Sequence, residues 1–566
     1  MSSGEELHAA VHAWIEADPD DHDRLELVSL LANNDNEELD RRFSSPLHFG
    51  TAGLRGPLEA GPSGMNRLSV RKATQGVASW LHELGPEAAV RGVVVGRDAR
   101  HGSEIFNREV VSVLLGAGIA VYEMPGPLPT PLVAFGVREL GASAGIMITA
   151  SHNPPKDNGY KLYDANGAQI IPPVDSIVER YASVALAPEL GETSSPLHHQ
   201  LDEAIVERYL ERMVSRFALS QPSDLAICYT PFHGVGGNTM AALLDAVGFT
   251  NVCRVAEQFI PDPDFPTLSF PNPEEPGALD VALACAKRHD CDLVLANDPD
   301  ADRLGAAVRA RDGSYRVLRG DEIGWLLAQA LLRWGVDVSS VFATSIVSSS
   351  LLQRMAAAAD IPFATTLTGF KWISRAGWER ERTLAFGYEE ALGYAVDDAV
   401  ADKDGMSAGA ALARFAEELR RENKSLLDEI DHLESHFGVH AVESLSVRVE
   451  GPSGHETITR AIDALLDNAP RELGGIAVNK VIDLSAGYDG LPPTDGVVLH
   501  LGTSGRVTVR PSGTEPKVKI YGEIVSDSCS LEDLPSLRAN ARANLANVLG
   551  STRERLVELL PAVEAK

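Results

Sequence analysis

A hydroxyl group stands on a stiff turn directly after a short apolar run. The segment GIMITASHNPP, residues 145–155, passes from apolar residues to Ser151 and His152 and then to two prolines. The apolar residues are typical of a buried strand, and the prolines prevent a regular strand or helix from continuing. Two interpretations of Ser151 stay open at this point. Its hydroxyl either bonds the local backbone of an Asn-Pro turn or is presented as a nucleophile.

Three aspartates form a second candidate site, because Asp298, Asp300 and Asp302 alternate directly after another apolar run. In extended backbone this spacing directs all three carboxylates to the same side. Such close like charges repel unless a cation joins them, and an all-oxygen ligand set suits a hard divalent ion, Mg²⁺ above all. An EF-hand is excluded, since its required glycine and glutamate are replaced by Arg303 and Arg309. A solvated acidic turn is the alternative.

A third segment, RPSGTEP, has the composition of a phosphate-binding turn. Arg510 is followed by Ser512, Gly513 and Thr514 between two segments that read as strands. A guanidinium fork, two hydroxyls and the N–H groups around a glycine together make a cradle for phosphate oxygens. The alternative is a plain Pro-Ser-Gly hairpin that happens to follow an arginine.

Two further loops carry charged residues for which both a functional and a structural role stay open. Arg55 lies in the glycine-rich segment FGTAGLRG, and Glu389 with Glu390 in FGYEEALGY. A carboxylate on a loop accepts hydrogen bonds from sugar hydroxyls, although acids at a helix start are also favourable structural residues. For Arg97 and Arg100 in GRDARHGS we favour a structural role.

Taken together, these segments supply the parts of one reaction. They offer a nucleophilic hydroxyl, a divalent metal site, a phosphate cradle and an acid suited to sugar hydroxyls. Phosphoryl transfer depends mainly on positioning and on stabilisation of charge, so little else is needed. We therefore expect Ser151 to carry a phosphoryl group beside a metal ion.

The elements that must position these loops repeat along the chain. Residues 92–124, 225–255 and 340–370 each read as strand, turn, helix and strand. Short connections of this kind predict right-handed crossovers and mostly parallel sheets, with ligands at the carboxyl ends of the strands. Each unit is followed by a further strand and then by one of the polar loops above. The alternative is that α/β chains repeat this order without common ancestry.

Composition limits the class of protein. The chain has 566 residues, 44% of them hydrophobic and 23% charged, as in a globular protein of several domains. We expect a cytoplasmic protein, because no segment reads as a signal peptide or membrane span and the five cysteines include no Cys-x-x-Cys. The net charge of −30 argues against nucleic acid or membrane as a partner. An anionic substrate then requires cationic groups concentrated at its site.

The chain resembles the α-D-phosphohexomutase superfamily, the phosphoglucomutases and phosphomannomutases, from about residue 40 onward. TASHNPPKDNGYKLY is similar to the phosphoserine loop of that family, and NDPDADR to its magnesium loop. GYEEALGY is similar to its sugar-binding loop, RPSGTEP to its phosphate loop, and TLTGFKWI to a further substrate-contacting loop. The motifs occur in the family's order.

The resemblance implies a reaction and a set of residues. Phosphorylated Ser151 would give its phosphoryl group to a sugar monophosphate. The resulting sugar bisphosphate would reorient within the cleft and return its other phosphate to Ser151. One Mg²⁺ would be bound by Ser151, Asp298, Asp300 and Asp302. The catalytic residues would be Ser151, Arg55, Lys161, His152 and Arg303, with Lys161 assisting proton transfer. The substrate contacts would be Thr368, Gly369, Lys371, Glu389, Arg510, Ser512, Gly513 and Thr514. A sugar bisphosphate would activate Ser151.

The resemblance also implies an α/β fold of four domains around a central cleft. The first three would share a mixed α/β topology, and the fourth would be a smaller α+β domain. We expect the divisions to be a helical extension at 1–45, domain 1 at 46–190, domain 2 at 197–318, domain 3 at 319–438 and domain 4 at 439–566.

The motifs predict the type of reaction, but they leave the identity of the sugar open. Many hexomutases have Glu-x-Ser in the sugar loop, whereas this chain has Glu389-Glu390-Ala391, and the histidine found after the loop in some phosphomannomutases is absent. These departures resemble the subgroup of phosphopentomutase-like and bisphosphate-synthase-like members. We expect a phosphosugar substrate with glucose favoured, mannose or a pentose as the alternative, and a monomer or homodimer. A phosphatase with an aspartyl nucleophile and an inactive binding paralogue are the remote alternatives.

Overall fold

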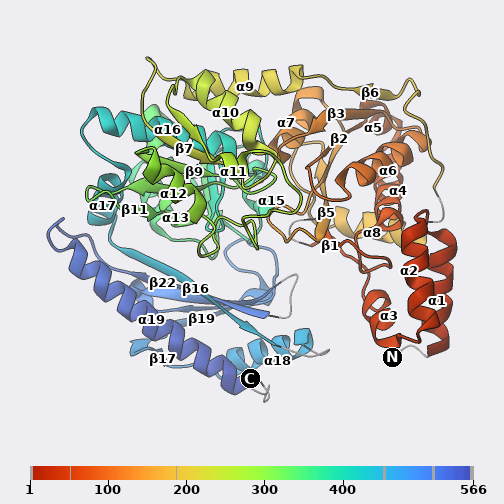
Figure 1. Cartoon of the computed structure of the whole chain (residues 1–566). Helices are drawn as coiled ribbons and strands as arrows, with labels where there is room; N and C mark the ends of the chain where they lie inside the picture. The colour runs from red at the N-terminus through yellow and green to blue at the C-terminus, as the bar shows by residue number, and fades with distance from the viewer. Residues whose placement is uncertain (1–3, 51–52, 186–187, 450–453, 513–516, 561–566) are drawn as a thin grey trace. The chain divides into compact units, whose positions relative to one another are not determined.

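The computed structural model describes residues 4–50, 53–185, 188–449, 454–512 and 517–560 (Figure 1). The chain divides into two compact units that alternate along the sequence. The first unit comprises Met1–Gly320, Phe370–Arg375 and Ala391–Glu418, and the second comprises Asp321–Gly369, Ala376–Glu390 and Leu419–Lys566. Within the described residues, no helix combines the length and the apolar character needed to cross a bilayer.

The first unit begins with a small helical layer. Its helices are α1 (Gly4–Ala17), α2 (Asp21–Ala32) and α3 (Asn36–Phe43). Leu7, Val11, Leu27 and Leu39 form a core of their own with Ala60. Asp20 and Asp35 cap α2 and α3, since their carboxylates accept hydrogen bonds from the first-turn N–H groups of His22 and Glu38.

A mixed sheet of the order β1-β5-β4-β2-β3-β6 follows. The strands are β1 (Leu54–Pro57), β2 (Val93–Arg97), β3 (Val121–Pro127), β4 (Ala144–Ile148), β5 (Asp157–Asp164) and β6 (His198–Gln200). The helices are α4 (Arg67–Glu83), α5 (Pro86–Arg91), α6 (Ser103–Gly116), α7 (Thr130–Leu140) and α8 (Val174–Val184). Val93 and Val95 of β2 belong to the core that α4 and α6 cover, while α7 also packs on β2 and β4. The central strands β2 and β4 are apolar without alternation because both faces of the sheet are buried there.

The second sheet of the first unit has the order β11-β10-β9-β7-β8. Its strands are β7 (Ile227–Thr230), β8 (Val252–Arg254), β9 (Leu293–Ala296), β10 (Gly305–Arg309) and β11 (Tyr315–Val317). The remaining elements of this unit are α9 (Ala204–Phe217), α10 (Gly236–Val247), α11 (Ala256–Phe259), α12 (Asp280–Arg288), α15 (Phe370–Ile373), β15 (Gly393–Ala395) and most of α16 (Gly405–Arg421).

The second unit contains a parallel sheet and an antiparallel sheet. The parallel strands are β12 (Val341–Ser345), β13 (Phe363–Thr366) and β14 (Leu384–Glu389), accompanied by α13 (Gly320–Trp334), α14 (Leu351–Ala358) and the turn η1 (Trp378–Arg380). The antiparallel strands are β16 (His440–Arg448), β22 (Lys517–Val525), β21 (Gly505–Pro511), β20 (Val497–His500) and β19 (Lys480–Asp483). Figure 1 shows the long helix α19 (Leu534–Leu559) running along this sheet. The smaller elements are α17 (Leu426–Phe437), α18 (Gly454–Asp467), β17 (Glu472–Leu473), β18 (Ile476–Ala477), η2 (Leu484–Ala486) and η3 (Gly502–Ser504).

The expected repetition of strand, helix and strand is confirmed. β2-α6-β3, β7-α10-β8 and β12-α14-β13 each end in a parallel pair of neighbouring strands. In each sheet the other neighbour of the first strand is also parallel to it, and these neighbours are β4, β9 and β14. The polar loops that carry Ser151, the three aspartates and Glu390 follow directly after these strands. The same topological position therefore carries a chemically different loop in each sheet.

Candidate active site

Ser151 lies three residues beyond the end of β4 in a strained and buried turn. Its φ of 54° is in the left-handed region, which non-glycine residues adopt at some cost in energy. Its N–H donates to the Thr149 hydroxyl at 2.9 Å. Its own Oγ lies 3.1 Å from His152 Nδ1 and donates to Asp298 Oδ2 at 2.9 Å. The turn thus aims the hydroxyl at the aspartate loop.

Arg100 holds this turn in place. The guanidinium is buried and donates hydrogen bonds at 2.6–3.2 Å to the carbonyl oxygens of Ser151, Asn153, Pro154 and Asp157. A planar fork of five donors suits this task, whereas a single ammonium would not reach all of the oxygens. The structural role expected of this arginine is therefore exerted on the serine loop itself, which its sequence neighbourhood did not indicate.

The three aspartates converge, although not in the way that their spacing predicts. Residues 298–302 form a turn rather than extended backbone, and Ala301 in it has a φ of 57°. One carboxylate oxygen from each of Asp298, Asp300 and Asp302 nevertheless lies within 4.8 Å of the others, and all three residues are fully buried. The turn is closely packed, since the N–H of Val235 donates to the Pro299 carbonyl at 2.8 Å and Gly405 lies against the carbonyl of Arg303.

Two lysines offset the negative charge of the aspartates. Lys161 Nζ, on β5, donates to Asp300 Oδ2 at 2.7 Å and to Asp302 Oδ2 at 2.6 Å. Lys403 Nζ donates to the same Asp302 oxygen at 2.8 Å, and both ammonium groups are buried. Thr130, the first residue of α7, donates its hydroxyl to Asp300 Oδ2 at 2.6 Å. Lys403 and Thr130 were missed by the sequence reasoning because they lie 101 and 170 residues from the aspartates that they bond.

The charge balance of the loop still favours a further cation. Burial, followed by the charges of Asp300 and Asp302, raises the pKa of Asp298 well above its usual range. Burial acts in the same direction on Asp302, but Lys161 and Lys403 hold the pKa of that carboxyl well below its usual range. Lys161 and Lys403 thus balance the negative charge of Asp302 but not that of Asp298.

The oxygen atoms of the loop fit a divalent metal ion. Among the residues that the structure describes, Oδ1 of Asp300 and Oδ1 of Asp302 are buried without a hydrogen-bond partner. Buried polar atoms almost always have partners, so orphaned carboxylate oxygens beside a third carboxylate indicate a ligand set that is incomplete. Hard oxygen donors of this kind are what Mg²⁺ prefers.

Arg55 and Arg303 lie close to the serine. Arg55 donates to Asn153 Oδ1 at 3.3 Å. The N–H of Arg303 donates to Asp298 Oδ1 at 2.9 Å, and its guanidinium bonds Glu274 at 3.3 Å. Burial, together with the charges of Arg303 and Arg55, lowers the pKa of His152 well below its usual range. His152, packed edge-on against Phe270, is therefore a neutral imidazole beside two guanidinium groups.

Two of the expected substrate loops of the second unit are in direct contact. The guanidinium of Arg510, near the end of β21, bonds the hydroxyl of Thr368, which is followed by Gly369 with a φ of 104°. Ser512 is buried, and its N–H donates to the Lys517 carbonyl at 2.8 Å. Gly513 and Thr514 lie outside the described residues. The cradle expected around Arg510 is thus visible only in part.

The segment GYEEALGY holds both candidate glutamates for sugar binding. Glu390 Oε2 accepts hydrogen bonds from the hydroxyls of Ser345 at 3.1 Å and Ser348 at 2.9 Å. Glu389 is the last residue of β14, and its side chain is half-buried. Glu390 is therefore held by hydrogen bonds within its own unit, which the sequence GYEEALGY did not reveal.

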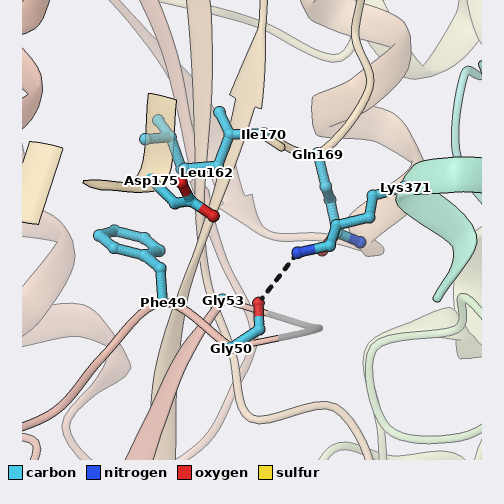
Figure 2. Close-up of a pocket in the computed structure, with 8 residues that line it drawn as sticks. All are labelled: Phe49, Gly50, Gly53, Leu162, Gln169, Ile170, Asp175 and Lys371. Carbon is cyan, nitrogen blue, oxygen red and sulfur yellow. Dashed lines mark hydrogen bonds between the residues drawn. The ribbon is translucent and has the colours of Figure 1, made fainter. Parts of the chain in front are cut away.

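Lys371, on the short helix α15 of the first unit, borders a pocket. The pocket lies between Lys371 and the chain at Phe49 and Gly50, with Leu162 and Gln169 also in its wall (Figure 2). Lys371 Nζ donates to the Gly50 carbonyl at 3.4 Å, and burial lowers the pKa of this lysine. Figure 2 shows the amine directed toward that carbonyl across the pocket.

Comparison with known proteins identifies the family. The models of all four domains of one family match the chain in order. Phosphoglucomutase/phosphomannomutase, alpha/beta/alpha domains I, II and III match residues 46–186, 207–313 and 319–436. The C-terminal domain of the same family matches residues 445–536. The chain belongs to the phosphoglucomutase/phosphomannomutase family. The resemblance and the four-domain α/β architecture are therefore confirmed, and the protein is an isomerase of the phosphomutase type.

Individual relatives of this phosphomutase match more than four fifths of it. A Haemophilus influenzae protein named "Probable phosphomannomutase" is 37% identical, over 81% of this chain and 92% of its own. The phosphopentomutase of Mus musculus is 35% identical, over 90% of this chain and 89% of its own. A solved structure of a putative phosphomannomutase from Thermus thermophilus matches with a TM-score of 0.67 and 25% identity, over 91% of this chain and 99% of its own. The names of the relatives differ in the sugar, so sequence similarity does not identify the sugar on which this protein acts.

Proposed function

We propose that this phosphomutase moves a phosphoryl group between the anomeric and the terminal hydroxyl of a sugar phosphate, with Ser151 as the carrier. The observation that supports this most directly is the 2.9 Å hydrogen bond from Ser151 Oγ to Asp298 Oδ2. It joins the one strained hydroxyl after β4 to a buried carboxylate loop with orphaned oxygens. A phosphoryl group on Ser151 would meet that loop directly.

Asp298, Asp300 and Asp302, with an oxygen of phosphorylated Ser151, are the proposed ligands of one Mg²⁺. When bound, the ion supplies Lewis-acid stabilisation of the negative charge that the phosphoryl group brings into the site. The two orphaned Oδ1 atoms support this ligand set, since each has a lone pair directed at no described donor.

The remaining proposed catalytic roles belong to the side chains around the serine. Arg55 and Arg303 would steady the transferring group, because guanidinium forks match phosphate oxygens. Lys161 bonds Asp300 and Asp302, and its proposed part in proton transfer is donation to the departing serine oxygen. Neutral His152 bonds Ser151 Oγ and would fix the direction of that oxygen.

The other phosphate and the sugar require groups outside the serine turn. Arg510, Ser512, Gly513 and Thr514 are the proposed phosphate cradle, and Thr368, Gly369, Lys371 and Glu389 the proposed sugar contacts. The bond from Arg510 to Thr368 supports a shared role for these two loops. A sugar bisphosphate would restore phosphate to Ser151 whenever the intermediate escapes.

For the sugar, we propose glucose phosphate first and a pentose phosphate as the second candidate. Glucose is favoured by the lack of the histidine that follows the sugar loop in some phosphomannomutases. The pentose is favoured by the mouse phosphopentomutase, which matches 90% of this chain. It is also favoured by the loop itself, in which Ala391 offers no hydroxyl and Glu390 is bonded to Ser345 and Ser348, leaving fewer groups for sugar hydroxyls.

The test is a coupled assay of the purified protein on glucose, mannose and ribose 1-phosphates, each with its bisphosphate. Intact-protein mass spectrometry after incubation with glucose 1,6-bisphosphate should show one added phosphate, mapped to Ser151. Turnover of ribose 1-phosphate alone would replace glucose by the second candidate. Phosphate on an aspartate instead of Ser151 would overturn the proposed mechanism.

A further inference from the structure

Four of the five cysteines gather at one place in the second sheet of the first unit. Cys228 lies on β7, Cys253 on β8, Cys285 on α12 and Cys291 in the turn that leads into β9. Cys228 and Cys253 are direct partners in the parallel β7–β8 pair, so their side chains leave the same face of the sheet. Helix α12 packs against β7 and β9, which brings Cys285 over that face. Residues separated by up to 63 positions thus meet through the topology.

The sulfur atoms are close enough to share a ligand. Cys253 Sγ and Cys285 Sγ are 3.5 Å apart, and the sulfurs of Cys228, Cys253 and Cys285 all lie within 4.8 Å of one another. Cys291 belongs to the same apolar cluster, but its sulfur is not in the group of three that lie within 4.8 Å of one another. A tetrahedral ion bound at ~2.3 Å to each sulfur needs sulfur separations of about 3.8 Å, which the group of three can adopt. A change in the side-chain position of Cys291 would then supply the fourth sulfur.

The surroundings of the thiols select the type of ligand. The cluster is enclosed by small apolar side chains, including Val255, Ala282 and Val294. In the described part of the chain, the group of mutually close ligand atoms at this place consists of sulfur alone. Thiolates without carboxylate or imidazole select a soft or borderline d¹⁰ ion over Mg²⁺. Cys253 is half-buried on the edge strand β8, which gives an ion a route of entry.

A redox role fits the thiols less well. Cys228, Cys285 and Cys291 are buried among apolar side chains, whereas redox-active cysteines lie in partly exposed, electropositive surroundings. Metal binding does not need such surroundings, because the ion itself displaces the thiol protons.

We propose that Cys228, Cys253, Cys285 and Cys291 form a structural zinc site that is separate from the aspartate triad. Binding replaces four S–H bonds by four Zn–S bonds and releases four protons to solvent, with no change of oxidation state. The ion would join β7, β8, α12 and the start of β9. Since β9 ends two residues before Asp298, the site would brace the strand that carries the metal-binding loop of the active site.

The test is a titration of metal-free, fully reduced, full-length protein with Co²⁺ alone. We expect one equivalent to give the near-ultraviolet charge-transfer absorption of thiolate-bound Co²⁺, and Zn²⁺ to abolish it. Oxygen ligands such as the aspartates do not produce this band, so occupancy of the triad cannot imitate it. Zn²⁺ should also raise the midpoint of thermal unfolding and protect Cys253 from alkylation.

Two variants make the test specific. Cys253→Ser, at a half-buried position, should lower the intensity of the band by about a quarter, as for three sulfur ligands in place of four. Cys529→Ser, in the second unit, should leave it unchanged. Circular dichroism checks that both variants are folded. No thiolate band in the wild type, an undiminished band in Cys253→Ser, or a loss of two mass units from a disulfide would each overturn the proposal.

Discussion

Ser151 Oγ donates a 2.9 Å hydrogen bond to Asp298 Oδ2, although the two residues are 147 positions apart. One residue follows β4 of the first sheet, and the other follows β9 of the second. The bond connects the proposed phosphoryl carrier to the proposed metal ligands without any intermediate group.

Replacement of Ser151 by alanine should abolish the mutase reaction. We expect turnover to fall by at least ~10³-fold, since a covalent carrier accounts for a large part of the barrier reduction. The coupled assay measures this, and mass spectrometry should find no phosphorylated protein. Ser215→Ala, at an exposed hydroxyl on α9, is the matched control. Mutase activity retained in Ser151→Ala would refute the assignment.

Asp300→Asn should weaken magnesium binding. The change removes the formal charge of a carboxylate with an orphaned oxygen, so we expect the Mg²⁺ concentration at half-maximal activity to rise by about tenfold or more. A magnesium titration of activity, supported by calorimetry, is the measurement. Asp312→Asn, in an exposed turn whose carboxylate bonds Ser314, should have no effect. An identical magnesium curve for Asp300→Asn and wild type would count against the ligand set.

Lys403→Met should separate the stability of the loop from metal binding. Loss of this ammonium leaves Asp302 with Lys161 alone, so the metal-free protein should lose about 3 kcal/mol in its free energy of unfolding. Mg²⁺ should then raise the unfolding temperature more than in the wild type, because the ion replaces the missing charge. Calorimetry with and without Mg²⁺ tests this. Equal magnesium-induced shifts in the two proteins would show that Lys403 does not balance the triad.

Arg100→Lys should disturb the geometry of the serine turn without removing a proposed substrate contact. A lysine cannot bond all the carbonyls that Arg100 holds, so the turn would lose its fixed geometry. We expect kcat to fall by about 10- to 100-fold with KM little changed, because a small misplacement of a reacting group has such an effect. The rate of Ser151 phosphorylation by bisphosphate should fall in parallel. An unchanged kcat in a folded variant would mean that the hydrogen bonds from Arg100 to the serine turn are not needed for catalysis.

The second unit should show an acid-dependent loss of stability through Glu523. Burial opposes ionisation of this residue, but Arg506, His440 and the Ser350 N–H lower its pKa to about 2 from a usual value near 4.5. A lowered folded-state pKa stabilises the fold above pH 4.5, and this contribution disappears as the pH falls toward 2. Glu523→Gln should therefore be less stable than wild type at pH 7, with a difference that shrinks by about 2 kcal/mol at pH 3. Denaturant titrations at both pH values measure this, and a constant difference would contradict it.

The sequence indicated the groups with local signatures but not their long-range supports. Ser151 and the three aspartates stand directly after apolar runs, so both their strands and their loops could be predicted. The spacing argument for the aspartates was wrong in its backbone, because a turn rather than extended chain brings them together. Lys403, Thr130 and the clamp of Arg100 depend on contacts between distant segments, which no spacing rule encodes. The gathering of Cys228, Cys253, Cys285 and Cys291 in one cluster could not be predicted for the same reason.

The alternation of the two compact units along the chain has a consequence for how this enzyme can diverge. Ser151, the aspartates, both lysines and the arginines of the serine turn belong to one unit, whereas every proposed sugar or phosphate contact except Lys371 belongs to the other. Substitutions in one unit can therefore change the proposed sugar contacts without altering the proposed phosphoryl-transfer residues of the other. The names of two relatives, a probable phosphomannomutase and a phosphopentomutase, differ in the sugar.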